Sequence, residues 1–172
     1  MKNPFKSQSG FTLIELVMVI VLIGILSYGA TSLYSSRDGF AGFIAKDQLI
    51  SSGLLAQQVA MGMSAMSDPV SLSVGVELVG GNNLWTFRLT KINPSDPDIV
   101  FELNPVTQDA SGGSLIIDGT TIGAGASQTF TWNSNASLSD GANHSVHFVG
   151  ANTFRVCFSA SGYVYESQVA CP

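Results

Sequence analysis

A run of 21 residues without a charge is the feature that most constrains how this chain folds. Residues 16–36 contain no Asp, Glu, Lys or Arg and are largely apolar. As a helix, the run extends for roughly 31 Å at about 1.5 Å per residue, which is close to the thickness of the hydrocarbon layer of a bilayer. The sequence therefore predicts a transmembrane helix over residues 11–36, preceded by a short leader over residues 1–10.

Charges on the two sides of the run predict its orientation. Lys2 and Lys6 precede it, whereas the basic and acidic residues between positions 37 and 47 cancel. Cytoplasmic flanks of membrane helices carry an excess of Lys and Arg. The N-terminus is therefore expected on the cytoplasmic side, and the chain after about residue 36 on the opposite side.

The exported part contains the two cysteines of the chain, Cys157 and Cys171. An oxidising compartment favours a disulfide, and two cysteines allow one intramolecular pairing. Closing a loop of this size stabilises a fold by about 3 kcal/mol in the chain-entropy model. Two free thiols are the alternative.

The part of the chain from Val70 onward is acidic, with three basic and eight acidic residues. The whole chain carries a formal net charge of -5. Nucleic-acid-binding domains present basic patches that neutralise phosphates, so this charge balance argues against DNA or RNA as a partner.

Helical periodicity continues past the apolar run to about residue 66. Residues 37–68 are predicted to be an amphipathic continuation of the helix, which packs on a sheet through one apolar stripe. The expected stripe consists of Phe40, Phe43, Ile50, Leu54 and Met61, with Lys46, Gln48 and Gln58 off it. The step Ser67-Asp68-Pro69 is expected to end the helix, because proline disfavours helical geometry in the residue before it.

After Pro69 the period of the apolar residues changes to two, which is typical of strands. Strands are predicted at residues 70–78, 84–92, 99–103, 114–118, 129–132, 145–149, 153–159 and 163–169. Turns are expected at residues 80–83 and 161–162, the second closing a hairpin that has both cysteines near its open end. The predicted fold class is α+β: a long N-terminal helix, transmembrane in its first half, packed on an antiparallel β-sheet domain over residues 69–172 with a C-terminal disulfide hairpin.

Glu15 is the only charge between residues 7 and 26, and two interpretations account for it. Thr12 and Glu15 have the spacing of a capping box, in which the two side chains bind free N–H groups at the start of a helix. The helix dipole favours a negative charge there by about 0.3–1 kcal/mol. A charge well inside a bilayer costs on the order of 2.5–3.5 kcal/mol, and such residues are usually paired or functional.

The residues around Glu15 also carry a resemblance to a known family. A short leader with two lysines, the step Gly10-Phe11, Glu15 four positions after Phe11, and the apolar run resemble the N-terminus of type IV pilins and type II secretion pseudopilins. The resemblance implies that a prepilin peptidase cuts between Gly10 and Phe11 and that Phe11 is then N-methylated. It also implies that Glu15 pairs with the N-terminal amine of a neighbouring subunit during filament assembly.

The resemblance further implies a location and a set of partners. The subunit would be a single-pass protein of the bacterial inner membrane with a cytoplasmic N-terminus, and would then enter a filament in the periplasm or at the cell surface. The expected partners are other pilin or pseudopilin subunits, the prepilin peptidase, the inner-membrane assembly platform and membrane lipid. The subunit is expected to be structural rather than enzymatic, without a cofactor.

Two details predict a minor subunit. Major pilins of this family usually carry a proline where this chain has Ser32. Residues 154–165 are similar to the terminal hairpin of minor pilins and pseudopilins of the GspH/FimT type, and in outline to minor pilins of mannose-sensitive haemagglutinin pili. The predicted function is therefore a minor pilin or pseudopilin, and the choice between a pilus and a secretion system stays open.

Other residues have weaker context for a functional site. His144 and His147 lie three apart in a predicted strand and point to opposite faces, so no metal site is expected. Asp96 and Asp98 are interpreted as a solvated turn in a loop rather than a calcium site. Aromatic residues on strands usually lie in the core or in cross-strand pairs. We therefore expect this placement for four aromatic residues rather than a carbohydrate-binding surface. These residues are Trp85, Trp132, Tyr163 and Tyr165.

Two alternatives use the same sequence differently. An ordinary signal peptidase accepts the small residues before Ala30, and a cut there would release a soluble periplasmic binding protein or enzyme. Glu15 within the apolar region argues against this alternative. A tip adhesin would keep the pilin-type N-terminus and bind carbohydrate through its strand domain.

Overall fold

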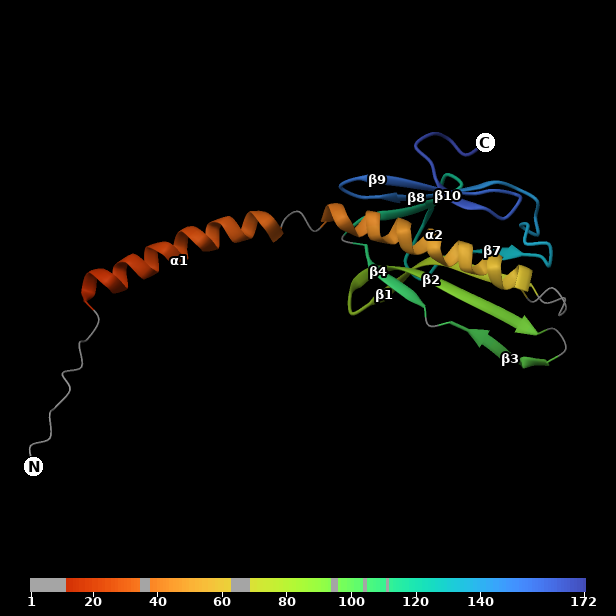
Figure 1. Ribbon diagram of the computed structural model, residues 1–172, viewed down its shortest axis with the longest axis horizontal. Coiled ribbons are helices and arrows are strands. Elements are labelled where there is room, and N and C mark those ends of the chain that lie inside the picture. The colour runs from red at the N-terminus through yellow and green to blue at the C-terminus, as the bar shows by residue number, and fades with distance from the viewer. Residues whose placement is uncertain (1–11, 35–37, 63–68, 94–95, 104, 111) are drawn as a thin grey trace, which may run out of the picture. The chain divides into compact units, whose positions relative to one another are not determined.

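The computed structural model describes residues 12–34, 38–62, 69–93, 96–103, 105–110 and 112–172. The chain divides into two compact units, Met1–Arg37 and Asp38–Pro172. The first unit contains helix α1 (Leu13–Tyr34), and the second contains helix α2 (Asp38–Gly62) and the strands (Figure 1). The predicted α+β class is confirmed.

Both helices lie within the bounds predicted for one helix from about residue 12 to 66. Residues 35–37, where the two were expected to be continuous, lie outside the described residues, as do residues 63–68 near the expected end. Within the described part of the chain, no helix combines the length and hydropathy needed to cross a membrane. The transmembrane segment at residues 11–36 therefore stays a prediction.

Five strands of the second unit form a first antiparallel sheet. They are β1 (Val70–Val79), β2 (Asn82–Asn93), β3 (Asp96–Glu102), β4 (Val106–Asp109) and β7 (Ser127–Trp132). The order is β3-β2-β1-β7, and β4 also pairs with β2. Gly80 and Gly81 join β1 to β2 with φ angles of 60° and 87°, as a two-residue hairpin turn requires.

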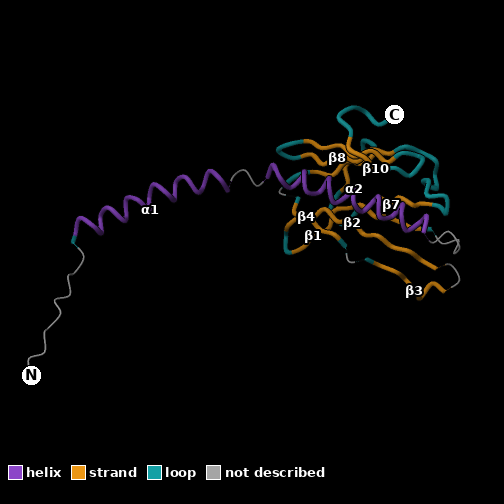
Figure 2. Tube along the Cα trace, in the orientation of Figure 1, coloured by secondary structure: helices purple, strands orange, loops and turns teal. Residues whose placement is uncertain are grey.

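Five further strands form a second antiparallel sheet, which Figure 2 shows in orange together with the first. They are β5 (Ser114–Ile117), β6 (Thr120–Ile122), β8 (His144–Val149), β9 (Thr153–Phe158) and β10 (Val164–Glu166). Their order is β10-β9-β8-β5-β6. The edge strands β10 and β6 have three residues each, which leaves little free edge for pairing with another chain.

The predicted antiparallel β-domain consists of two sheets, because β5 and β6, which lie between β4 and β7 in the chain, pair with each other and with β8 instead of joining the first sheet. Periodicity detects strands but not their neighbours, and the partners here are distant in sequence: Val70 lies opposite Trp132. Strands β4 and β6 were not predicted, since both are short and mostly polar. Asp96 and Asp98 belong to β3 rather than to a loop.

Aromatic rings connect the two sheets in one core. Trp85 of β2 contacts Phe148 of β8, with ring centroids 5.0 Å apart. Phe130 of β7 stacks on Phe158 of β9 at 4.3 Å. Each such pair contributes about 0.5–1.5 kcal/mol beyond the area that it buries, so these contacts hold the sheets face to face.

The four aromatic residues expected in the core or in cross-strand pairs divide into two groups. Trp85 and Trp132 are buried, which confirms the prediction for both. Tyr163 is 62% exposed and precedes β10, so it is not in the core, whereas Tyr165 is 37% exposed and lies in a cross-strand pair opposite Cys157. Both lie at the edge of the second sheet, where a side chain on the outer face has no covering layer.

Helix α2 packs on strands of both sheets through its smallest side chains. The buried face consists mainly of Ala41, Gly42, Ala45, Leu49, Gly53, Ala56 and Ala60. The expected stripe lies largely on the opposite face, where Phe40, Phe43, Leu54 and Met61 are exposed. The predicted packing is wrong, because periodicity identifies an apolar face but cannot show that a face of alanine and glycine allows a closer approach.

Two glycines of α2 lie where a side chain would collide with the second sheet. A Cβ at Gly53 would lie 2.5 Å from Val164 Cγ2, and a Cβ at Gly42 would lie 3.0 Å from Phe154 Cδ2. Atoms at such distances must move, which means that the helix approaches the sheet as closely as the backbone allows. Glycine in a helix costs about 1 kcal/mol relative to alanine, and this close packing offsets that cost.

We expect Gly53→Ala to lower the free energy of unfolding by about 1–3 kcal/mol, because the added methyl group overpacks the contact with Val164. Gly62→Ala is the matched control, since a Cβ there meets nothing within 4 Å. Denaturant unfolding of the full chain in detergent, followed by fluorescence of the buried Trp85 and Trp132, measures both changes. Equal stability of the two variants would contradict the assigned contact.

Candidate functional site

Glu15 lies in the first turn of α1, where its carboxylate caps the helix. Glu15 Oε2 accepts hydrogen bonds from the Thr12 backbone N–H at 3.4 Å and from Thr12 Oγ1 at 3.5 Å. These contacts correspond to the glutamate half of the predicted capping box. Both distances lie at the long end of the hydrogen-bond range, so the cap is weak and leaves the carboxylate free to take a stronger partner.

The large apolar side chains of α1 from Leu13 to Leu26 are exposed. Their exposed fractions run from 44% for Val17 to 83% for Leu13. A helix that is apolar all round is normally covered by lipid or by other helices. Glu15 is therefore one carboxylate on a surface that is otherwise suited to burial.

Gly10 and Phe11, the predicted cleavage and methylation residues, lie outside the described residues. Their predicted roles, and the role of Glu15 in assembly, stay predictions.

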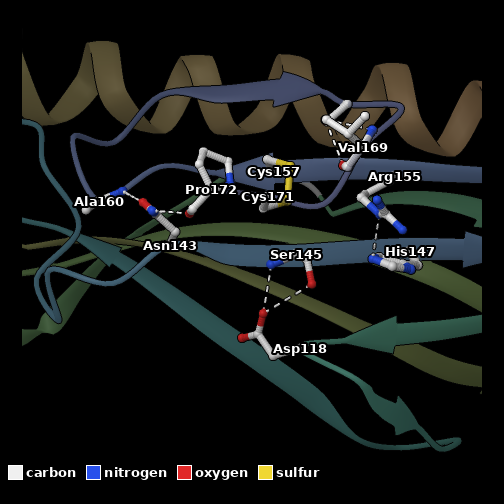
Figure 3. Close-up of a disulfide and its surroundings, with 11 residues drawn as sticks. Asp118, Asn143, Ser145, His147, Arg155, Cys157, Ala160, Val169, Cys171 and Pro172 are labelled. Atoms are coloured by element: carbon white, nitrogen blue, oxygen red, sulfur yellow. Dashed lines mark hydrogen bonds between the residues drawn. A yellow bond between two sulfur atoms is a disulfide. The ribbon is translucent and has the colours of Figure 1, made fainter.

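Cys157 and Cys171 form the predicted disulfide, which fixes the C-terminal tail on the last hairpin (Figure 3). Its expected place near the open end of the hairpin is wrong. Cys157 lies opposite Tyr165, in the second residue pair from the turn. The chain after β10 folds back toward the turn end of the hairpin, which brings Cys171 to Cys157. Asn143 holds the same tail, since its side-chain amide donates to Pro172 O and accepts the Ala160 N–H at 2.6 Å.

Lys46 is a buried cation that joins α2 to the terminal hairpin, although its position in the helical pattern predicted a place off the packed face. Its Nζ lies 2.8 Å from Glu166 Oε2 and 3.3 Å from Asp47 Oδ1. The rings of Phe43 and Phe154 lie 4.4 and 5.6 Å from Nζ, within cation–π distance. The hydrogen bond to Glu166 raises the pKa of Lys46 against the opposing effect of burial. The ammonium therefore stays charged within the packed face.

We expect Glu166→Gln to lower the free energy of unfolding by about 1–3 kcal/mol, because it weakens a charge-assisted hydrogen bond to a buried ammonium. Asp47→Asn is the matched control: Asp47 contacts the same Nζ from a more exposed position, where an ion pair contributes about 0–1 kcal/mol. Denaturant unfolding of the full chain measures both. A larger loss in Asp47→Asn would show that Glu166 is not the main anchor.

His144 opens β8 and lies between two carboxylates. Its Nδ1 is 2.6 Å from Asp118 Oδ2, and its Nε2 is 2.7 Å from Asp140 Oδ2. Burial lowers the pKa of His144, but hydrogen bonds and charge from the two aspartates outweigh it and raise the pKa above its ordinary 6.5. The sequence did not predict this cluster, because Asp118-Gly119 is typical of a turn and Asp140 lies in a polar loop without a recognisable motif.

His147 has a different partner from His144. Arg155 Nε donates to His147 Nε2 at 3.0 Å. Burial, followed by the charge of Arg155, lowers the pKa of His147. Among the described residues, no group of three or more His, Cys, Asp and Glu side chains is arranged to hold a metal ion.

The face of α2 that points away from the sheets borders an apolar groove of about 410 Å³. Its lining residues are Ile44, Asp47, Gln48, Ser51, Ser52 and Leu55 of α2 and Val106 of β4. Ile44 and Leu55, the two large apolar residues of α2 in this lining, are 40% and 39% exposed. The groove is therefore a small apolar hollow at the edge between α2 and β4.

These features define a class of protein: an exposed apolar helix that begins beside a capping glutamate, followed by a compact, disulfide-closed α+β unit. Residues 5–30 match the family model of the prokaryotic N-terminal methylation motif, the signature of type IV pilins and pseudopilins. The chain therefore has the N-terminus of a type IV pilin-like or pseudopilin subunit. Neither a curated protein nor a solved structure matches the chain significantly.

Proposed function

We propose that the protein is a minor pilin or pseudopilin, a structural subunit that enters a type IV pilus or a related secretion filament through its N-terminal helix. The match of residues 5–30 to the methylation motif carries this proposal. The exposed apolar surface of α1 supports it, because helix-to-helix packing in a filament would bury that surface. Such a subunit acts by association and needs no catalytic group.

In the proposed filament, Glu15 exchanges its weak cap on Thr12 for a charge on another subunit. The partner is the N-terminal amine of a neighbouring Phe11. Unit charges about 4 Å apart attract by about 4 kcal/mol at an effective dielectric constant near 20, which offsets the desolvation of both groups. Since one axial offset between helices brings the carboxylate to the amine, the pair also fixes the register of the subunits.

This amine exists only after the leader is removed. We assign the cut between Gly10 and Phe11 to a prepilin peptidase, and the methyl group to the new N-terminus at Phe11. Before assembly, residues 11–36 hold the subunit in the inner membrane with its N-terminus in the cytoplasm. There it meets the assembly platform and the other subunits.

The outer face of α2 is a second contact surface in this proposal. The groove beside Ile44, Leu55 and Val106 suits an apolar side chain of a neighbouring subunit. The minor role and the likeness to GspH/FimT-type or mannose-sensitive haemagglutinin minor pilins rest on two sequence features. These are Ser32 in place of the usual proline and the terminal hairpin at residues 154–165.

We expect Glu15→Ala and Glu15→Gln to reduce incorporation into filaments by at least about tenfold, because a loss of about 1.4 kcal/mol already has that effect. Thr12→Ala is the matched control, since it removes the capping hydroxyl but keeps the carboxylate. Immunoblots of sheared filaments from the native host, compared with the membrane pool, measure incorporation. Normal incorporation of Glu15→Ala would contradict the pairing role, and equal loss in Thr12→Ala would assign Glu15 to capping.

We expect the mature protein from membranes of the native host to begin at Phe11 with one added methyl group. Intact-protein and N-terminal peptide mass spectrometry measures both properties at once. A mature chain that begins at Ala30 would show ordinary signal-peptide cleavage, and the function would then lie in the strand domain alone.

A further inference from the structure

The His144 imidazole connects separate segments of the second unit at one point. Asp118 approaches it from the turn between β5 and β6, and Asp140 from the loop before β8. The ring of Phe130, on β7 of the first sheet, contacts the imidazole edge to face with centroids 5.2 Å apart. The His144 side chain is 14% exposed, so the two aspartates, rather than water, are the main partners of its ring nitrogens.

Only the imidazolium form of His144 fits this geometry. Both ring nitrogens face a carboxylate oxygen, at 2.6 and 2.7 Å. A neutral imidazole has one N–H, so its other nitrogen would direct a lone pair at an oxygen that has no proton to donate. Loss of the proton therefore converts one of two charge-assisted hydrogen bonds into a repulsive contact.

The two carboxylates differ in what else holds them. Asp118 Oδ1 accepts the Ser145 backbone N–H at 2.7 Å and the Ser145 hydroxyl at 3.4 Å, so strand β8 retains it. Asp140 Oδ1 accepts the Ala142 N–H at 3.1 Å, a bond within its own loop. Asp140 is also the more exposed, at 56% against 44% for Asp118. Asp140 is therefore the carboxylate that moves away from His144 when the imidazolium loses a proton.

The loop that carries Asp140 also holds the end of the chain. Asn143 bonds both the Ala160 N–H in the last hairpin turn and Pro172 O in the tail, as Figure 3 shows. The disulfide fixes Cys171 directly beside Pro172. A displacement of the loop is thereby passed on to the hairpin turn and the tail.

We propose that His144 is a pH-sensitive latch, which in its protonated form clamps residues 139–143 to the β5–β6 turn and on deprotonation releases Asp140, loosening this loop and the C-terminal tail. The proton leaves from Nε2 to solvent, while the Nδ1–H group keeps its hydrogen bond to Asp118. No other reactant is required. The latch controls how firmly one edge of the domain presents its loop and tail, independently of how the N-terminal helix assembles.

The remaining ionisable side chains near the latch do not reverse the sign of its pH dependence. His147 of β8 and Arg155 of β9 line the same hollow of about 250 Å³ and bond each other. Burial lowers the pKa of His144, but the aspartates outweigh it and hold the pKa above 6.5. The stabilisation is therefore fully present below pH 6.5 and is lost as the pH rises through the folded-state pKa.

An NMR titration of the full chain in detergent tests the latch without any substitution. We expect the His144 ring signals and the backbone amide signals of Ala142, Asn143 and Ala160 to change together, with one inflection above pH 6.5. His147 is the internal reference, with its inflection below pH 6.5. A His144 inflection at or below 6.5, or amide signals that stay constant through it, would overturn the proposal.

Two variants identify the group that drives the change. His144→Gln should abolish the pH dependence of the Ala142 and Ala160 amide signals, whereas His147→Gln should leave it intact. Asp140→Asn should shift the His144 inflection downward. Persistence of the loop titration in His144→Gln would assign it to another group and reject the latch. If His144→Gln does not fold, the wild-type titration together with Asp140→Asn decides the question.

Discussion

The second unit depends on how closely α2 approaches the two sheets. Alanine and glycine occupy most of the packed face, and the backbone at Gly53 lies against Val164 without space for a methyl group. The same junction holds Lys46, whose ammonium is paired with Glu166 on the terminal hairpin. At this close approach α2 covers the core formed by Trp85, Phe148 and their neighbours. Small side chains and one buried ion pair therefore position the helix on the two sheets.

A face of small residues turned inward leaves the larger apolar residues of α2 outside. Phe40, Ile44 and Leu55 are exposed for this reason, and Ile44 and Leu55 line the groove beside Val106. Helix α1 shows a related property, since its large side chains are exposed along the described part. Both helices thus offer apolar surface that association can bury, which is the property that a filament subunit needs.

Glu15 and His144 illustrate two ways of holding a charge. Glu15 has long contacts to Thr12 at a helix start and can change its partner at little cost. His144 is enclosed by two short contacts, so its charge is tied to the surrounding geometry. The first arrangement suits a group that acts in assembly, and the second suits a group that reports the pH.

The sequence by itself determined the signature at residues 5–30, the α+β class, the bounds of most strands and the pairing of Cys157 with Cys171, because each depends on local spacing or on a single possible combination. It did not determine that the strands form two sheets, since pairs such as Val70 and Trp132 meet only in the folded chain. It also assigned the wrong face of α2 to the core and missed the partners of Lys46 and His144. Glu166 is 120 positions from Lys46 and Asp118 is 26 positions from His144, so only the tertiary structure brings these partners together. Asp140 is four positions from His144, but it contacts the imidazole through the conformation of a loop that has no periodic pattern.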